Sequence, residues 1–503
     1  MRGPAGLKLV AASIPILLAG ATAALCLIPR IGPASAAPSR PPLRPGPGSG
    51  FRTSEPPMMR ALDPRVTLLP ILSAGDTLVA NDPGDLPFIL PGRIEGLAAR
   101  PAGKGLAEAY VSHAHGWVDG RGGAIVSRLL LDLRNVGVMA ADFLIETAEQ
   151  YAWLRRASLA DDRAGFLSPT LLVNEASTDG PRQGVVTAVE PRSGTASDLP
   201  WLGRGDHGST IALPVVGGRI ALVGTMGRIL GQHRILLYLA GSEGEFRSGA
   251  GRLFVLRSRA FAGQATFTPE RGALGIQKNF PIQGEFVPID RATAESPAAL
   301  ELKGERVGSL DFERLEGLAI DREDPNAFYV ADAGGSTTPG TLFSGGGATE
   351  NGRLYHLVLD SSDPTRVHSI EVILDGSQGD DLHRPSSIDT DERCVMILED
   401  PGARGLRRSR VLRYDTRTRR LDEIAECADL DRKLRPLPEG QGGEWGSTGI
   451  VNASDILGVD SWLLAVQART LRVRQRGGSW GEAGQILLLR GERYPRARSP
   501  VDQ

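Results

Sequence analysis

A carboxylate stands beside a glycine where one short apolar run begins, and a second carboxylate closes the next run. The stretch is FERLEGLAIDREDPNAFYVADAGG, which contains Glu316, Gly317 and Asp332. Carboxylates at strand ends can bind hard cations such as Ca²⁺, which takes about six to eight oxygen ligands. The alternative is that Glu316 caps a turn and meets only water.

A weak internal repeat would bring several strand ends together, which a shared cation site requires, and both interpretations of Glu316 stay open. The segments EGLAID to AFYVAD, PSSIDTDERCVMILED and STGIVNASDILGVDSWLLAVQ each place a small residue before two apolar strands joined by a polar turn. Aligning Gly317, Ser387 and Gly449 gives spacings of 70 and 62 residues (387−317 and 449−387). Strand pairs that recur around an axis indicate a β-propeller with long insertions. The small residue would let each inner strand crowd the axis.

The rest of the chain supports an all-β fold. Short apolar runs alternate with turn residues, as in TLLV (170–173), GRIALVGT (218–225), RILLYLAG (234–241) and QILLLRG (485–491). Such runs are too short for typical helices and too frequent for a βαβ alternation. A few short helices are expected as well. The clearest helical stretch is 141–158, whose apolar residues fall near one face of a helix.

Composition and the N-terminal segment limit the possible partners and the cellular location of the protein. The net charge of −2 leaves no basic field for a nucleic-acid backbone, so that class of partner is excluded. Residues 1–37 combine a positive start, an apolar run and small residues, which predicts a signal peptide, with an uncleaved membrane anchor as the alternative. Residues 38–60 form a Pro- and Gly-rich linker, and 61–498 a single propeller domain. The body is therefore expected outside the cytoplasm, as a monomer.

Two cysteines lie in the expected domain. Cys394 and Cys427 could form one disulfide in an oxidising compartment, or remain as two buried thiols. The sequence leaves both possibilities open, because spacing along the chain does not give the distance between their Cα atoms.

Four stretches resemble the PhoX-type alkaline phosphatase family. They are FERLEGLAIDREDPNAFYVAD, GRLYHLVLD with VILDGSQGDD, RPSSIDTDERCVMILEDP with RVLRYDTRTRRLDEIAE, and EWGSTGIVNASDILGVDSWLLAVQAR. The upstream segment AYVSHAHGWVDGRGGAIVSRLLLD is similar to the family's segment from NHE to VSRWxID. The resemblance runs from about residue 109 to 469, in the family's order. It implies a six-bladed propeller whose axial pocket binds Fe and Ca and hydrolyses phosphate monoesters.

The resemblance also implies site residues. By position, the metal ligands carried over are Glu175, Glu316, Glu399 and Asp400. Further candidates for the site are His113, Asp332, Glu444 and Gln467.

Several acidic positions of the family are neutral here. Ala114, Ala176, Gly446, Asn452 and Ala465 replace carboxylates, and Arg469 stands at the family's histidine. Because affinity for hard cations follows the charge of the ligands, these losses weaken a multi-metal cluster. Two hypotheses follow: an exported, metal-dependent phosphatase acting on a small phosphorylated substrate, or a degenerate propeller that binds a ligand or protein partner without hydrolysis.

Overall fold

The computed structural model describes most of the chain after residue 49. The described residues are 43, 50–79, 86–114, 123–146, 151–227, 233–259, 269–335, 351–402, 405, 407–431, 435–438, 441–475 and 480–492. Contacts divide the chain into two units, Met1–Pro38 and Ser39–Gln503. The first unit, with the expected signal peptide or anchor, lies outside the described residues, and everything below concerns the second.

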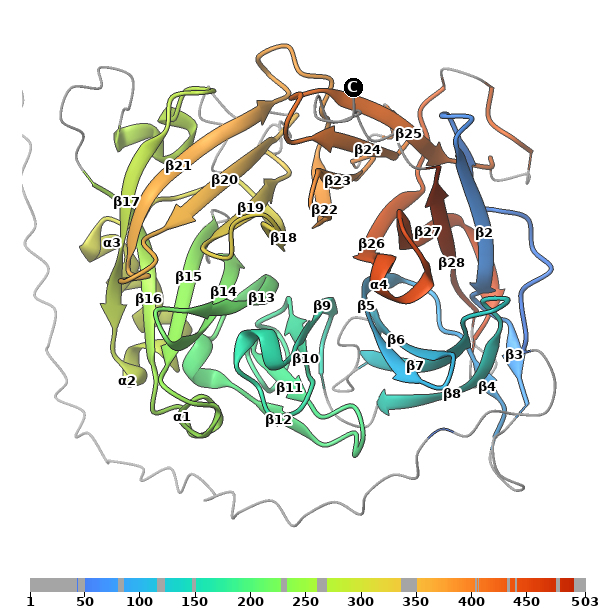
Figure 1. Cartoon of the computed structure of the whole chain (residues 1–503), viewed down its shortest axis with the longest axis horizontal. Helices are drawn as coiled ribbons and strands as arrows, with labels where there is room; N and C mark the ends of the chain where they lie inside the picture. The colour runs from blue at the N-terminus through green and yellow to red at the C-terminus, as the bar shows by residue number, and fades with distance from the viewer. Residues whose placement is uncertain are drawn as a thin grey trace, which may run out of the picture. The chain divides into compact units, whose positions relative to one another are not determined.

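The strands form six antiparallel blades around one axis, which confirms the predicted all-β propeller (Figure 1). Blade 1 contains β5 (Ile94–Gly103), β6 (Leu106–His113), β7 (Ile125–Asp132) and β8 (Val138–Ile145). Blade 2 contains β9 (Leu154–Ala160), β10 (Thr170–Glu175), β11 (Val186–Val189) and β12 (Ala196–Asp198). Blade 3 contains β13 (Asp206–Val216), β14 (Arg219–Gly227), β15 (His233–Ala240), β16 (Arg252–Ser258) and an extra outer strand, β17 (Ile282–Ile289).

The second half of the ring repeats this plan. Blade 4 contains β18 (Leu315–Ile320), β19 (Ala327–Asp332), β20 (Arg353–Leu359) and β21 (Arg366–Asp375). Blade 5 contains β22 (Pro385–Thr390), β23 (Cys394–Glu399), β24 (Arg410–Asp415), β25 (Leu421–Cys427) and β1 (Met59–Ala61). Blade 6 contains β26 (Gly446–Asn452), β27 (Ser461–Arg474), β28 (Trp480–Gly491) and β2 (Val66–Ser73).

Short elements fill the connections. They are the hairpin β3 (Thr77–Leu78) and β4 (Phe88–Ile89), the helices α1 (Glu243–Ser248), α2 (Arg291–Ala294), α3 (Pro297–Val307) and α4 (Ser454–Leu457), and the 3₁₀ turns η2 (Asp162–Ala164), η3 (Pro200–Leu202) and η4 (Pro269–Gly275). Helix α3 begins where the Ser296 hydroxyl accepts a hydrogen bond from Ala299 N, with Pro297 in its first turn. It ends at Gly308, whose φ of 67° suits glycine. Among the described residues, no helix combines the length and apolar character needed to span a bilayer.

The first strand of each blade lies innermost, and these six strands neighbour one another around the axis. A small residue near the start of the inner strand makes this approach possible. A Cβ on Gly317 would lie 3.2 Å from the backbone N of Ile388 in blade 5, and one on Gly449 3.3 Å from the N of Leu97 in blade 1. The repeat that aligned these glycines is therefore confirmed, although the close neighbour is the next inner strand rather than the axis itself.

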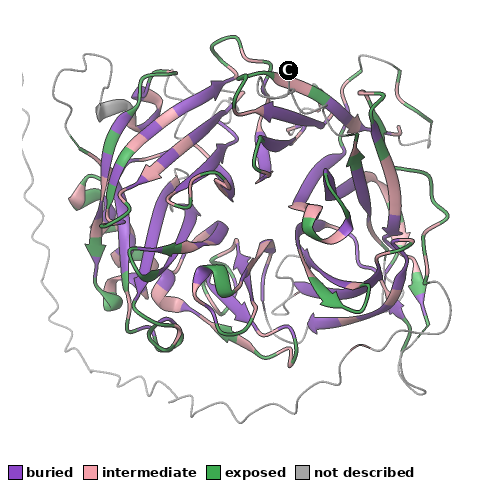
Figure 2. Ribbon diagram, viewed as in Figure 1, coloured by how far each residue is buried: buried purple, intermediate pink, exposed green. Residues whose placement is uncertain are grey.

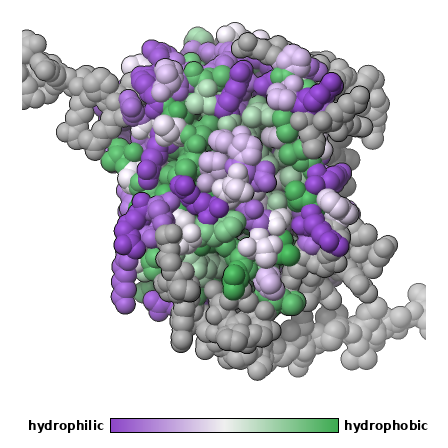
Figure 3. All heavy atoms as spheres, turned by 90° about the vertical axis from the view of Figure 1, so that its right-hand side faces the viewer, coloured by the Kyte–Doolittle hydropathy of each residue, from purple (hydrophilic) through white to green (hydrophobic). Residues whose placement is uncertain are grey.

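The apolar core lies between blades, one cluster for each neighbouring pair. Buried residues accordingly follow the strands, while exposed ones gather in turns and outer strands (Figure 2). Trp445 and Trp462 pack between blades 5 and 6. Cys394 and Cys427 are both buried free thiols, the second of the two alternatives. On the side of the molecule that carries β2 and β28, hydrophilic and hydrophobic residues are interspersed (Figure 3).

Two N-terminal strands close the ring. β2 pairs with β28 to complete blade 6, and β1 pairs with β25 at the outer edge of blade 5. Contacts with the propeller begin within the stretch expected to be a linker, because Phe51 and Val138 exchange backbone hydrogen bonds of 2.9 and 2.7 Å.

The helix predicted over 141–158 was wrong. Residues 138–145 form β8, which pairs with β7, and residues 154–160 form β9, the inner strand of blade 2. The apolar residues of this stretch fit two short strands as well as one helical face, and cross-strand pairing decides the outcome. Because β9 was not predicted, its two arginines, Arg155 and Arg156, were not recognised as residues of the axis.

Candidate functional site

Five of the eight predicted site residues occupy one equivalent position in different blades. In blades 1 to 5 the second strand ends opposite the first residue of the inner strand, and in blade 6 the residue at this position lies within β27, which continues to Arg474. At this position stand His113 opposite Ile94, Glu175 opposite Leu154, Asp332 opposite Leu315, Glu399 opposite Pro385 and Gln467 opposite Gly446. Blade 3 has Gly227 there, opposite Asp206. The fold therefore brings these side chains to one end of the propeller.

The carboxylates at this position are bound by backbone N–H groups of their own blade. Glu175 Oε1 accepts from Ala152 N at 2.8 Å, and its Oε2 from Gly184 N at 3.1 Å. Ala152 lies two positions before β9, so the bond fixes the loop that enters the inner strand. Burial raises the pKa of Glu175 to about 7.

Asp332 and Glu399 make the equivalent bond in blades 4 and 5. Asp332 accepts from the N of Glu313 at 3.1 Å, and Glu399 from the N of His383 at 2.7 Å, each two positions before the inner strand. Burial raises the pKa of Asp332, and it raises that of Glu399 to about 6 although Arg410 donates to both of its oxygens.

His113 binds the equivalent loop of blade 1, but it donates a hydrogen bond to a backbone carbonyl where the carboxylates accept one from a backbone N–H. Its Nδ1 lies 3.1 Å from Gly92 O, again two positions before the inner strand, and its Nε2 lies 2.9 Å from Ser127 Oγ. Because a carbonyl can only accept, the network assigns the proton to Nδ1.

Glu316 differs, because it is the second residue of an inner strand and faces the axis. Arg155 Nη1 lies 2.9 Å from its Oε2, and Arg314 Nε lies 2.7 Å from its Oε1. Burial opposes ionisation of Glu316, but the two guanidinium groups hold its pKa well below the usual value. Arg155 belongs to blade 2, so this ion pair passes blade 3 and joins blades 2 and 4.

Asp400 and Gln467 both accept hydrogen bonds from the same arginine, Arg469. Arg469 Nη2 donates to Asp400 Oδ2 at 2.9 Å, and its Nε to Gln467 Oε1 at 3.4 Å. Burial acts against the charge of Asp400, yet Arg469 keeps its pKa below the usual value. Gln467 also donates to Glu95 Oε1 at 2.7 Å. Glu444 is exposed, in the turn before β26.

Arg156, the next residue of β9, crosses the axis. It is 8% exposed, and its guanidinium donates to the carbonyls of Glu95 at 2.6 Å, Ser386 at 2.8 Å and Thr448. These carbonyls belong to the inner strands of blades 1, 5 and 6. Arg155 and Arg156 together therefore tie blade 2 to four other blades.

Buried side-chain nitrogens without a hydrogen-bond partner occur at this end, and Arg155 Nε and Trp153 Nε1 are among them. Arg93 stacks over the Trp153 ring, with its guanidinium carbon 4.7 Å from the ring centroid. Unsatisfied buried donors are rare in native proteins and need an explanation.

The donor set does not match a cluster of hard cations. Within the described residues, no three His, Cys, Asp or Glu side chains form a group that could hold a metal ion. The oxygens of Glu175, Glu316, Glu399 and Asp400 instead accept from guanidinium or backbone N–H groups. The arrangement thus presents arginine donors, rather than free carboxylates, around the axis.

The chain is a β-propeller with an arginine-rich axial end, and one solved structure supports the propeller fold. Among solved structures, PhoX of Pseudomonas fluorescens in complex with vanadate, a transition-state analogue, aligns over 88% of this chain and 98% of its own, with a TM-score of 0.58 and 13% identity. The α-L-arabinanase of Penicillium chrysogenum aligns over 84% of this chain and 98% of its own, with a TM-score of 0.40 and 11% identity. No family model and no curated protein matches the sequence. The PhoX likeness shows a PhoX-like propeller fold.

Proposed function

We propose that this protein binds a small oxyanion, such as phosphate or a phosphate monoester, at the arginine-rich end of its axis without hydrolysing it. The observation that carries the proposal is the pairing of Glu316 with Arg155 and Arg314. A carboxylate neutralised in this way is a poor cation ligand, whereas the surrounding guanidinium groups suit an anion.

The unpartnered donors support the same proposal. Arg155 Nε and Trp153 Nε1 would both be satisfied by oxygens of a bound anion. The PhoX neighbour was solved with vanadate, an oxyanion. In this chain the oxyanion would meet side-chain N–H groups.

The test is calorimetric titration of the full-length protein with phosphate and with phenyl phosphate. Arg155→Met should weaken binding about tenfold or more, since hydrogen bonds to charged groups contribute about 1.5–3 kcal/mol each. The matched control is Arg134→Met, because that side chain is 89% exposed and pairs with Asp132. Equal affinity of the Arg155 variant and the wild type would contradict the proposal.

The second candidate is hydrolysis of phosphate monoesters by a metal-dependent, PhoX-type phosphatase, favoured by the fold likeness over nearly the whole chain. It requires Fe or Ca in the purified protein and turnover of p-nitrophenyl phosphate that a chelator abolishes. Elemental analysis and this assay separate the two candidates, and chelator-sensitive turnover would overturn the first.

We also propose that the protein acts outside the cytoplasm. The support is the signal-like sequence of residues 1–37. Fractionation of expressing cells tests this, and a purely cytoplasmic protein would contradict it.

A further inference from the structure

A cavity of about 530 Å³ opens at the other end of the axis. All six inner strands line it, and each contributes residues that follow its start, such as Gly96 to Pro101 of β5 and Gly317 to Ile320 of β18. The cluster around Glu316 lies at the starts of these strands. The lining of the cavity therefore lies mostly farther along the strands than the proposed oxyanion site, and nothing in the proposed function uses it.

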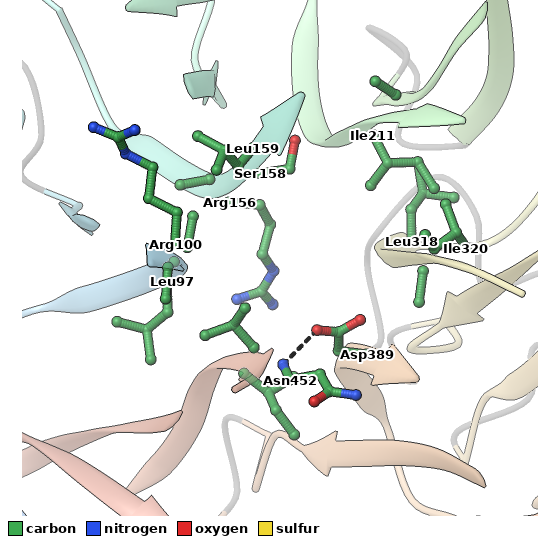
Figure 4. A pocket seen from close by; sticks show the side chains of 18 of the residues that line it. Leu97, Arg100, Arg156, Ser158, Leu159, Ile211, Leu318, Ile320, Asp389 and Asn452 are labelled. Atoms are coloured by element: carbon green, nitrogen blue, oxygen red, sulfur yellow. Dashed lines mark hydrogen bonds between the residues drawn. The ribbon is translucent and has the colours of Figure 1, made fainter. Parts of the chain in front are cut away.

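Much of the wall of the cavity is aliphatic, while charged residues also line it, among them Arg100, Asp161, Asp162, Arg163 and Asp455. Figure 4 shows Leu97, Leu159, Ile211, Leu318 and Ile320 around it. No aromatic side chain belongs to its lining as described. Aromatic faces commonly stack flat rings. A cavity of this size with aliphatic walls instead suits a flexible hydrocarbon chain.

Arg156 supplies a charge within these walls. In Figure 4 its side chain extends from β9 into the middle of the cavity. The carbonyls of Glu95, Ser386 and Thr448 use three of its five N–H groups, since each accepts one hydrogen bond. The Nε–H is buried without a partner. A buried cationic donor that lacks an acceptor is costly, and an anionic ligand group would satisfy it.

A second donor lies nearer the rim. Arg322 follows the end of β18, lines the cavity and has a buried Nε without a hydrogen-bond partner. The nearby Asp389 accepts from the backbone N of Thr390 at 2.8 Å and of Asn452 at 2.6 Å. Its carboxylate is therefore occupied by the protein, whereas both arginines retain a free donor.

We propose that this cavity binds an amphiphilic anion, with an unbranched aliphatic chain against the apolar walls and a carboxylate or phosphate head on Arg156. The aliphatic walls of this site lie farther along the inner strands than the Glu316 cluster, whereas the Arg156 guanidinium binds carbonyls near the strand starts, close to that cluster.

Calorimetric titration of the full-length protein with octanoate, decanoate, decyl phosphate and decanol tests the proposal. Decanoate should bind about tenfold more tightly than octanoate, because two further methylene groups are buried. Comparing decanoate with decyl phosphate identifies the preferred head group. Decanol should bind at least about tenfold more weakly than the better anion.

Three variants locate the site. Arg156→Met should weaken anion binding about tenfold or more, and Ile320→Trp, which fills the cavity from its partly exposed wall, should abolish it. Arg163→Met is the matched control, because this rim arginine is 70% exposed and should leave binding unchanged.

Because Arg156 joins several blades, its variant could fail to fold, and circular dichroism checks this. Ile320→Trp then decides the matter alone. Wild-type affinity in the Ile320 variant, absence of binding by either anion, or equal binding of decanol would each overturn the proposal.

Discussion

At the scale of single residues, the neighbours of a carboxylate decide its role. Glu175, Asp332 and Glu399 sit at equivalent strand ends and each fixes a loop through backbone N–H groups. Glu316 faces the axis and is neutralised by Arg155 and Arg314. Residue type and spacing singled out Glu316 and Asp332, and the family resemblance added Glu175 and Glu399, whereas the hydrogen bonds that occupy them depend on loops and on arginines from other blades.

Replacing Glu316 with glutamine should destabilise the fold by about 3 kcal/mol, because the largely buried Arg155 would keep its charge without this counter-ion and Arg314, 41% exposed, would lose its partner. Urea unfolding monitored by tryptophan fluorescence measures this free energy. The control is Glu323→Gln, whose pair with Arg417 is exposed on both sides and should contribute less than about 1 kcal/mol. Equal effects of the two substitutions would contradict the buried-pair account.

Glu175 predicts a pH dependence of stability. Its pKa is about 7 in the folded protein against 4.5 for the free side chain, so the folded state holds the proton more tightly between these values. Stability should therefore fall as the pH rises through this window, by about 2 kcal/mol for this group.

Glu175→Gln removes the titration, so its unfolding free energy should vary less between about pH 5 and about pH 7 than that of the wild type. The amide also loses one acceptor for a backbone N–H, which shifts stability at every pH without changing the slope. Urea unfolding across the window measures both terms, and parallel curves would show that burial does not raise this pKa.

At the scale of elements, the inner strands approach closely where the sequence supplies a small residue. A Cβ on Gly96 would lie 2.6 Å from Ala157 N and 2.9 Å from Arg155 O, both backbone atoms of the next blade. Any side chain there must displace β9, which carries Arg155 and Arg156.

Gly96→Ala should therefore destabilise the protein by about 2 kcal/mol or more, through overpacking against backbone. Gly244→Ala is the matched control, because its added Cβ would meet nothing closer than Ser242 Oγ at 3.8 Å in helix α1. That variant should be neutral or stabilised by up to about 1 kcal/mol. Thermal unfolding of both variants tests the difference, and a neutral Gly96→Ala would refute the close approach.

Much of the element order could be predicted, because each strand carries its own apolar run and turn. The runs at 218–225, 234–241 and 485–491 became β14, β15 and β28. The stretch 141–158 failed because its apolar spacing fits a helix as well as two strands, and only pairing with β7 and β10 distinguishes them. Because that strand was missed, Arg155 and Arg156 could not be placed on the axis from the sequence alone.

At the scale of the whole molecule, the propeller depends on strands far apart in the chain. β2 pairs with β28 from Val66 opposite Gly491 to Ser73 opposite Gln485. Without β2, blade 6 would have three strands and the edge of β28 would be open for pairing with another chain.

Removing residues 1–73 should therefore cost about 5 kcal/mol from the buried Val66, Ile71 and Leu72 alone, a large part of a typical domain's stability. We expect aggregation and loss of cooperative thermal unfolding, measured by size-exclusion chromatography and circular dichroism. Removing residues 1–49 should leave both unchanged. An intact, cooperative protein without β2 would show that the ring closes by other means.

Blades 3 and 4 are joined differently from the other neighbours, because β17 pairs with β21 and makes their strands one nine-stranded sheet. Elsewhere in the described chain, no strand of one blade pairs with a strand of the next, so neighbouring blades can move apart without breaking a backbone ladder. Of the six boundaries between neighbouring blades, strand pairing therefore bridges the one between blades 3 and 4, and no strand pair of the described chain bridges the other five. Thermal fluctuations should separate the blades first at a boundary without strand pairing. A molecule that reaches the axis from the side would therefore enter through such a boundary.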